Sequence, residues 1–504
     1  MELQDKNRLG KILRSLVQSD YLKLVLVLAL ALYLAFIPHQ GYQYPVHVDE
    51  WVHMALSTEL LDNGGTDGLT SPFTGKNTEW NQRVELGFHL FWGIFQEITS
   101  IPWVSIIRYF PAIIFMITVL SVYALCRKAG FGWEAALFAC LVPTAIGILG
   151  PGFLVPVAMG MVFIPLALFT LFYLRGWQSY VLLLLFFSLM MLTHAATAVS
   201  MIIIFSAYIL LSFFKNERKH ALAVVITLML PFASSLLFMR RIVLNKIGSL
   251  FVTQPLPQHV DLPLDFATYG YLPTIIFAIG IFSLIRSGGS RNHGLAFGSL
   301  ALLTMVITFV KFHYGVELVY LRGFVHLQLM MGVVAGSGLL WLRNIRLPDS
   351  LGARVKPAFI SRNIGGILGL IVIVLTLIMV VPSRQNTIYY HMIDKHDYDA
   401  FAWIAENVEE YYDKAILDPW KATAFTAITG RKIYSKIVMS PGEDDMRAYE
   451  FLGKGCLNTA FLRNNNITIV YTRQQCENPD LINVRRYVYL LEATSPIITS
   501  SGSH

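Results

Sequence analysis

Charged side chains are scarce in this sequence of 504 residues. Asp, Glu, Lys and Arg make up 14% of the chain and hydrophobic residues 55%, which excludes a soluble domain of ordinary composition. The apolar residues form continuous runs, whereas the strands of a transmembrane β-barrel would alternate polar and apolar residues, so a barrel is excluded as well. Lipid is therefore the expected solvent of most of the chain.

The net charge of +7 does not indicate a nucleic-acid partner. Residues 1–383 contain 26 Lys and Arg against 17 Asp and Glu, while residues 384–504 contain 13 against 15. The basic excess thus belongs to the apolar part of the chain, where it reflects membrane topology. We predict no nucleic-acid binding.

The first apolar run, 21–38, lacks a small-residue cleavage site, so we expect it to remain as an uncleaved first helix. A hydrocarbon core of roughly 30 Å needs about 20 mostly apolar residues per helix. Eleven segments come near that length: 21–38, 104–126, 133–149, 152–174, 178–193, 196–214, 221–239, 270–285, 294–310, 323–342 and 363–382. The sequence therefore predicts an α-helical polytopic membrane protein with about eleven transmembrane helices.

The basic residues also predict an orientation in the membrane. With the N-terminus in the cytoplasm, 18 of the 26 basic residues before residue 384 fall on the cytoplasmic side. The C-terminal segment then lies outside, where Cys456 and Cys476 could form a disulfide, although two buried thiols are an equal alternative. Asn466-Ile467-Thr468 matches the N-glycosylation tripeptide. We predict a multi-pass protein of the cell membrane with an extracytoplasmic C-terminal domain.

Residues 384–504 differ in character from the chain before them. Short strand-like runs at 415–417 and 467–471 alternate with helical stretches, and Gly430 marks the end of one such helix. This pattern predicts a small α/β domain. The expected division is a transmembrane domain at 1–383, which contains a long first outer loop at 39–103, and an extracytoplasmic domain at 384–504.

Directly after the first span, the chain reads His47-Val48-Asp49-Glu50-Trp51-Val52-His53, so two adjacent carboxylates are flanked by two imidazoles. Carboxylates near a bilayer surface lose hydration, and they are retained where they bind a cation, accept a proton or meet a polar substrate. A solvated loop with a helix cap is the structural alternative. A zinc-protease site is excluded, because the His-Glu-x-x-His pattern requires His in place of Asp49.

An acidic pair after the first transmembrane helix, many helices and an external C-terminal domain resemble the GT-C superfamily of membrane glycosyltransferases. Distant relatives of this kind include archaeal and bacterial oligosaccharyltransferase catalytic subunits. Three segments are similar to the start of their external domain: Trp403-Ile404-Ala405-Glu406-Asn407, Asp418-Pro419-Trp420 and Thr429-Gly430-Arg431.

The resemblance implies a reaction and its partners. The donor would be a sugar on a polyprenyl phosphate, and the acceptor a glycan, lipid or protein hydroxyl, with membrane lipid around the helices. An acid of the first outer loop would serve as catalytic base or help to bind a metal, which matches Asp49 with Glu50 as its neighbour. A divalent cation such as Mg²⁺ or Mn²⁺, with Asp49 and Glu50 as ligands, is the implied cofactor.

Sugar transfer from a polyprenyl phosphate assigns expected roles to further polar residues. Transfer from a phosphate leaving group needs a base for the acceptor hydroxyl, for which we choose Asp49, and cations for the departing charge. Arg322, at the outer entrance of the tenth span, is a candidate phosphate ligand; an interfacial anchor or a partner for Glu317 is the equal alternative. Three imidazoles complete the candidate substrate-binding set: His47, His53 and His194. For His194, a structural hydrogen bond is the favoured alternative.

The resemblance to oligosaccharyltransferases is incomplete. No Asp or Glu occurs between Glu134 and Glu217, so a second acidic motif is missing from the outer turn at 150–152, and the chain contains no Trp-Trp pair. We therefore predict an inverting hexosyl- or pentosyltransferase that moves one sugar at the outer face, with oligosaccharyl transfer to protein as an alternative. A transporter or flippase is a further hypothesis, which the small number of charges inside the predicted spans disfavours.

Overall fold

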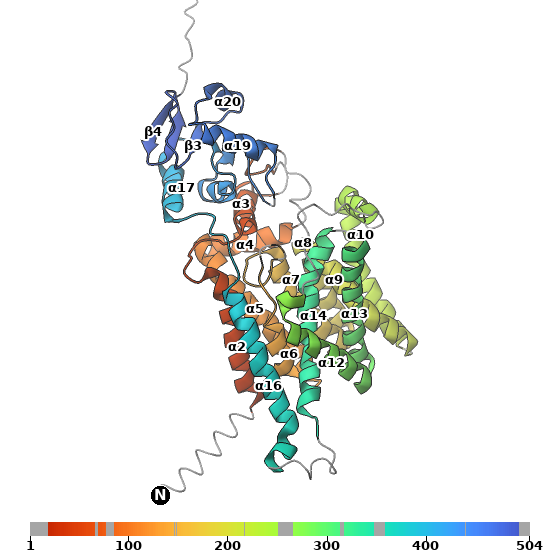
Figure 1. Cartoon of the computed structure of the whole chain (residues 1–504). Coiled ribbons are helices and arrows are strands. Elements are labelled where there is room, and N and C mark those ends of the chain that lie inside the picture. The colour runs from red at the N-terminus through yellow and green to blue at the C-terminus, as the bar shows by residue number, and fades with distance from the viewer. Residues whose placement is uncertain are drawn as a thin grey trace, which may run out of the picture. The chain divides into compact units, whose positions relative to one another are not determined.

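The computed structural model describes residues 19–65, 69–76, 85–145, 147, 149–215, 217–249, 266–312, 317–346, 358–438 and 440–492. The chain divides into two compact units. The membrane unit comprises Met1–Gln43, Val84–Phe88 and Val104–Tyr389, and the sheet unit comprises Tyr44–Arg83, His89–Trp103 and Tyr390–His504. Most of the elements are helices (Figure 1), in agreement with the predicted fold class.

The membrane unit is built from long apolar helices. They are α2 (Asp20–Phe36), the short η1 (Ile37–His39), α5 (Trp103–Arg127), α6 (Gly132–Ala139), α7 (Pro156–Tyr173), α8 (Trp177–Thr193), α9 (Ala195–Phe214), α10 (Arg218–Ser249), α11 (Phe266–Tyr269), α12 (Tyr271–Ser287), α13 (Ser290–Phe312), α14 (Glu317–Arg343) and α16 (Ala358–Gln385). Among the described residues, seven helices are long and apolar enough to cross a membrane, and α8 and α12 are shorter apolar helices. The protein is therefore a multi-pass membrane protein, while the predicted number of eleven spans is not confirmed.

Helix α14 forms the centre of the membrane unit, with α12 and α13 beside it (Figure 1). It also packs against α6, α9 and α16, and 83% of its apolar segment is buried inside the protein. Two glycines allow the neighbouring helices to approach closely. A Cβ at Gly336 would overlap backbone atoms of α6, and one at Gly338 would overlap the backbone of α12.

The predicted span at 133–149 is not a continuous helix. Only Gly132–Ala139 is helical, and the described residues from Cys140 to the start of α7 form turns and irregular chain with one isolated bridge, Ala145 to Leu149. Pro143 explains the early end, because a proline ring clashes with the carbonyl four residues before it in a helix. The backbone N–H of Gly152 donates to Oγ1 of Thr144 at 2.8 Å and closes this irregular segment.

The sheet unit has a five-stranded mixed sheet. Its strands are β1 (Lys414–Ile416), β2 (Lys432–Ile433), β3 (Ile469–Tyr471), β4 (Leu481–Arg485) and β5 (Val488–Leu491), in the order β2-β1-β3-β5-β4. Strand β1 runs parallel to β2 and β3, whereas β5 is antiparallel to both β3 and β4. Helices α17 (Lys395–Asn407), α18 (Ala422–Thr429), α19 (Glu443–Gly453) and α20 (Thr459–Asn464) connect the strands. The predicted small α/β domain is confirmed.

This unit contains more of the chain than the 384–504 segment of the sequence prediction. Helix α3 (Val48–Asp62) of the first outer loop packs against α18, and the N–H of Ile433 in β2 donates to the carbonyl of Phe73 at 2.8 Å. Most of α4 (Leu86–Thr99) belongs to the same unit. The first outer loop is therefore part of the α/β unit and is held by its edge strand.

A disulfide joins Cys456 to Cys476 and settles the alternative that the sequence left open. Cys456 is fully buried and belongs to the hydrophobic core between α19 and the sheet, together with Leu462 and Val470. Asn466 of the glycosylation tripeptide lies on the exposed turn after α20. The other two cysteines, Cys126 and Cys140, are free and buried in the membrane unit.

Candidate functional site

The acidic motif of the first outer loop forms the start of helix α3. His47 is the N-cap, and its Nδ1 accepts the N–H of Asp49 at 3.1 Å. Oε2 of Glu50 accepts two backbone N–H groups in return, from Val46 at 2.9 Å and from His47 at 3.1 Å. This is a capping box in which His47 replaces the usual Ser or Thr.

The capping box separates the roles of the two neighbouring acids. Glu50 is 1% exposed and its carboxylate is engaged by the backbone, so the structure gives it a task in shaping the helix. The expected catalytic and metal-binding roles of Glu50 stay a prediction beside this capping role. The side chain of Asp49 is 24% exposed, and its Oδ2 lies 3.8 Å from Nδ1 of His47. Its place in the first helical turn also favours a negative charge.

One turn after Asp49, His53 contacts a histidine from another helix. Nδ1 of His53 and Nε2 of His89 in α4 are 2.9 Å apart. His89 is 3% exposed, and burial lowers its pKa to about 4, so its imidazole is neutral at physiological pH. His89 was not singled out from the sequence. Two imidazoles 36 residues apart leave no local signal.

The His53–His89 pair can hold a metal ion. A neutral imidazole nitrogen is a good ligand for zinc and other transition metals, and the short distance between the two nitrogens suits neighbouring positions around one ion. Glu85 lies one helical turn before His89 and offers a carboxylate ligand. The metal-ligand set expected at Asp49 and Glu50 stays a prediction; Oε2 of Glu50 already accepts two backbone N–H groups.

The remaining predicted residues lie in the membrane unit. Nδ1 of His194 is 2.7 Å from Oγ1 of Thr197, which is 3.1 Å from Nε2 of His326, and Nδ1 of His326 is 2.9 Å from Oγ of Ser200. All four side chains are buried. His194 therefore makes the structural hydrogen bond that was its favoured alternative, within a longer polar chain that joins α9 to α14.

Arg322 lies one turn before His326 on α14, and its positive charge acts on both His326 and His194. The side chain of its alternative partner, Glu317, lies outside the described side chains. The structure thus brings His194 and Arg322 together in the membrane unit, while His47, Asp49 and His53 lie together in the sheet unit.

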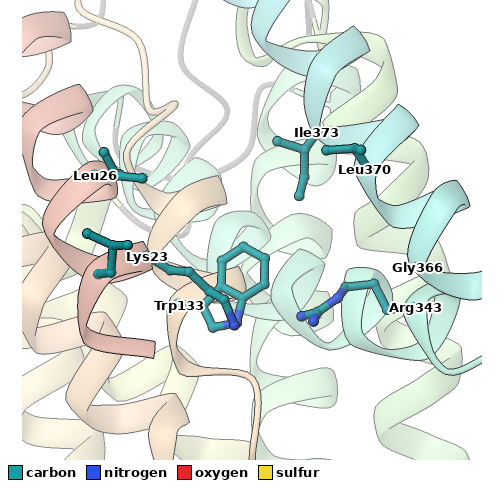
Figure 2. Close-up of a pocket in the computed structure, with 8 residues that line it drawn as sticks. Lys23, Leu26, Trp133, Arg343, Gly366, Leu370 and Ile373 are labelled. Carbon is teal, nitrogen blue, oxygen red and sulfur yellow. The ribbon is translucent and has the colours of Figure 1, made fainter. Parts of the chain in front are cut away.

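A separate cleft of about 430 Å³ opens between helices of the membrane unit (Figure 2). Its walls are mostly aliphatic side chains of α2 and α16, and Lys23 and Arg343 face the ring of Trp133 from 5.1 and 4.8 Å. Both cations are already paired, Lys23 with Asp20 and Arg343 with Glu134. None of the lining residues is an acid or a histidine, so we do not assign the chemistry to this cleft.

Comparison with known proteins identifies the fold. No protein-family model matches the sequence, and no curated protein sequence matches it. The structure is similar to the apo oligosaccharyltransferase of Archaeoglobus fulgidus, with 14% identity, 90% of this chain and 70% of that chain covered, and a TM-score of 0.59. It is also similar to the arabinofuranosyltransferase AftD from Mycobacteria, with 14% identity and a TM-score of 0.57. That match covers 93% of this chain and 40% of the AftD chain.

The structure is also similar to that of ArnT from Cupriavidus metallidurans over nearly the full length of both chains. The match covers 93% of this chain and 97% of that chain, with 12% identity and a TM-score of 0.50. These likenesses concern the arrangement of the helices and of the external unit, since the identities are low. They agree with the resemblance that the sequence indicated. The chain therefore shares the fold of these three solved structures, as the resemblance predicted.

Proposed function

We propose that this protein is a glycosyltransferase that moves one sugar from a polyprenyl-phosphate donor to an acceptor hydroxyl. The observation that carries the proposal is the carboxylate of Asp49, partly exposed in the first turn of the helix after the first span, in a chain with the GT-C fold. A related structure was obtained with a dolichol-phosphate, which supports a lipid-linked donor. The acceptor hydroxyl belongs to a glycan, a lipid or a protein.

In the proposed reaction, Asp49 removes the proton of the acceptor hydroxyl. The hydroxyl oxygen then forms a bond to the anomeric carbon while the bond from that carbon to the phosphate oxygen breaks, and the electron pair leaves with the phosphate. Attack from the side opposite to the leaving group inverts the anomeric configuration. Arg322 is the proposed ligand of the phosphate, because its forked guanidinium matches phosphate oxygens.

A divalent cation is the proposed cofactor, held by His53 and His89 one turn from Asp49. When bound, it supplies positive charge near the reacting groups. A related oligosaccharyltransferase structure contains Zn and sulfate, which supports a metal in a protein of this fold. His47 completes the site by capping α3 and orienting its first turn, where Asp49 lies.

The reaction is proposed to take place at the extracytoplasmic face. The excess of basic residues in alternate loops supports a cytoplasmic N-terminus. The disulfide between Cys456 and Cys476 supports an oxidising environment for the sheet unit, because cytosolic thiols are kept reduced. The exposed Asn466 is consistent with that side of the membrane.

Transfer of radiolabelled sugar from polyprenyl-phosphate donors by the detergent-solubilised protein tests the proposal. Asp49→Asn should abolish transfer, because an amide cannot accept the proton, while the protein melts as the wild type does. Asp62→Asn is the matched control, since Asp62 is an exposed acid at the other end of the same helix. Undiminished transfer by Asp49→Asn would assign the base to another residue, and no transfer from any donor would refute the proposal.

Transfer of a whole lipid-linked glycan to protein is a second candidate. The similarity to the Archaeoglobus fulgidus oligosaccharyltransferase, which has also been solved with an acceptor peptide containing an NVT sequon, favours this alternative. The absence of Asp and Glu between residues 134 and 217 weighs against it. Adding a sequon peptide to the same assay separates the two, because only oligosaccharyl transfer labels the peptide on asparagine.

A further inference from the structure

The cleft of the membrane unit (Figure 2) lies between α2 and α16, which are joined near one end. Nε2 of Gln385, the last residue of α16, donates to the hydroxyl of Tyr33 in α2 at 2.5 Å. Further along, α2 packs against α6 and α16 packs against α14, so different helices hold the two walls. The volume of about 430 Å³ opens there, within the range of about 300–1,000 Å³ that ligand sites occupy. The cleft is therefore large enough for a ligand.

The walls of this cleft suit an acyl chain. Leu26 of α2 and Leu370 of α16 line it with exposed aliphatic side chains. Gly366 lies on the same wall of α16, and a Cβ added there would have no neighbour within 4 Å, so the space beside it is open. One turn later, a Cβ at Gly369 would overlap the side chain of Arg343, so this glycine allows the stem of Arg343 to lie against α16. The two glycines thus leave room for a chain and place a cation beside it.

Two cations converge on one aromatic ring of the cleft. Nζ of Lys23 is 5.1 Å from the ring centroid of Trp133, and the central guanidinium carbon of Arg343 is 4.8 Å from it. Figure 2 shows these cations on two sides of the ring. Their side chains are 27% and 31% exposed, so both remain partly open. Lys, Arg and Trp at the ends of spans are typical of the membrane interface, where lipid headgroups lie.

The neighbouring carboxylates leave these cations accessible. No residue that lines the cleft is an acid. Asp20 pairs with Lys23 at 3.0 Å, but its side chain is 60% exposed, and such an exposed pair contributes little. Glu134 is buried and engages only Nη1 of Arg343 among the described residues, so the other guanidinium donors are left for a ligand. Arg127 adds a third cation beside the first turn of α2, where its Nη2 donates to a tyrosine hydroxyl at 2.9 Å. The mouth of the cleft therefore suits an anionic group.

We infer that this cleft binds an acidic phospholipid, with its phosphate at Lys23 and Arg343 and an acyl chain along α2 and α16. The cations fall on the side of the membrane that the basic residues predict to be cytoplasmic, and the leaflet on that side carries anionic lipids. Basic pockets between transmembrane helices on that side bind headgroups of this kind. An ordinary boundary lipid would need the aliphatic walls alone and would not select a headgroup. The inference concerns lipid binding and does not depend on the transfer reaction.

Native mass spectrometry of the full-length protein in detergent tests the headgroup. Titration with dioleoyl phosphatidylglycerol and with dioleoyl phosphatidylcholine compares an anionic with a neutral net charge on the same acyl chains. The wild type should bind phosphatidylglycerol at least about fivefold more tightly, the value of one Lys or Arg contact with an anionic lipid. Lys23→Met keeps the aliphatic stem and should lower this affinity by about threefold to fivefold, with phosphatidylcholine unaffected. Arg286→Met is the matched control, because Arg286 is an exposed cation in the last turn of α12, outside the cleft.

Gly366→Leu tests the path of the acyl chain and leaves both cations in place. The added side chain enters the open space beside α16, so it should reduce the affinity for phosphatidylglycerol to that for phosphatidylcholine. Gly453→Leu is the control, because Gly453 lies in helix α19 of the sheet unit and a Cβ there also has no neighbour within 4 Å.

Equal affinity of the wild type for the two lipids would overturn the inference and reduce the cleft to a site for boundary lipid. Unchanged lipid selectivity in Lys23→Met, or an equal loss in Arg286→Met, would overturn the role of the cations. Normal binding by Gly366→Leu would place the acyl chain elsewhere and would overturn the inference as well. Melting curves identify a variant that fails to fold. Because Lys23→Met and Gly366→Leu test the headgroup and the chain separately, the loss of one variant leaves the other decisive.

Discussion

Asp397 is a buried carboxylate of the sheet unit with several hydrogen-bond and ion-pair partners. It is 1% exposed, and its oxygens accept from Nζ of Lys421 at 2.9 and 3.0 Å, from the hydroxyl of Tyr471 at 2.6 Å and from the N–H of Asp394 at 2.9 Å. Arg473 adds an ion pair at 2.9 Å. These donors come from the start of α17, the entry to α18 and the region of β3, so one side chain joins three parts of the fold.

Asp397→Ala should destabilise the sheet unit strongly. It leaves Lys421, whose side chain is only 18% exposed, without its carboxylate, and removing one partner of a buried ion pair costs about 3–5 kcal/mol. Arg473 is 43% exposed and keeps Asp394, so its share is small and the lower end of that range applies. At about 2–4 °C per kcal/mol for a unit of this size, the melting temperature should fall by roughly 6–12 °C.

Thermal unfolding together with hydrogen exchange of β3 and α17 measures this effect. Glu450→Ala is the control, because its pair with Lys454 is exposed on both sides and should contribute nothing measurable. The double variant Asp397→Leu with Lys421→Met removes both charges and should recover part of the lost stability, since no buried charge is left unpaired. If Asp397→Ala melts like Glu450→Ala, or if the double variant is no better than the single one, the buried pair is not the cause.

Two further predictions concern other carboxylates of the sheet unit. Glu50→Ala removes the acceptor of two backbone N–H groups and should lower the free energy of unfolding by about 1–2 kcal/mol, as measured by denaturant titration. Loss of transfer by Glu50→Gln at unchanged stability would instead support the catalytic role that the sequence predicted for Glu50. Burial raises the pKa of Asp394, but the hydrogen bond from Arg473 outweighs it and the pKa falls to about 2. Its contribution to stability is therefore complete above its unfolded pKa near 4 and is lost as the pH falls through 2. Asp394→Asn should flatten this part of the acid-unfolding curve, and an unchanged curve would contradict the assignment.

The sequence predicted well those features that depend on the solvent around the chain. Continuous apolar runs located most of the long helices, including α2 and α14, because lipid requires helical spans of similar length. The short strands β1 and β3 were visible as apolar runs between helical stretches. The segment 133–149 was equally apolar, yet only its first part is helical. Burial within the protein and burial in lipid give the same composition, so hydropathy alone could not separate them.

The candidate site could be predicted only in part, because its contacts link distant segments. The motif around Asp49 was evident, and Glu50 three residues after His47 has the spacing of a capping box. Histidine is an uncommon N-cap, however. The spacing of His47 and Glu50 therefore did not reveal from the sequence that Glu50 caps the helix while Asp49 does not. The contact of His53 with His89 and the approach of Lys436 to Phe73 arise from tertiary packing. Neither has a pattern in the local sequence.

The packing of the first outer loop explains why a distant part of the chain matters for Asp49. Helix α3 rests on α18, and the segment at Phe73 is bonded to β2, so two separate elements of the C-terminal chain hold the loop. Just after β2, Nζ of Lys436 lies 3.5 Å from the ring centroid of Phe73 and adds a further contact to this loop segment. The ion pair of Asp397 with Lys421 joins α17 to the start of α18. Because α3 rests on α18, weakening this ion pair should loosen the support of α3 and so disturb the position of Asp49. The Asp397→Ala variant should therefore lose sugar transfer at a lower temperature than the wild type, even though Asp397 takes no part in the proposed reaction.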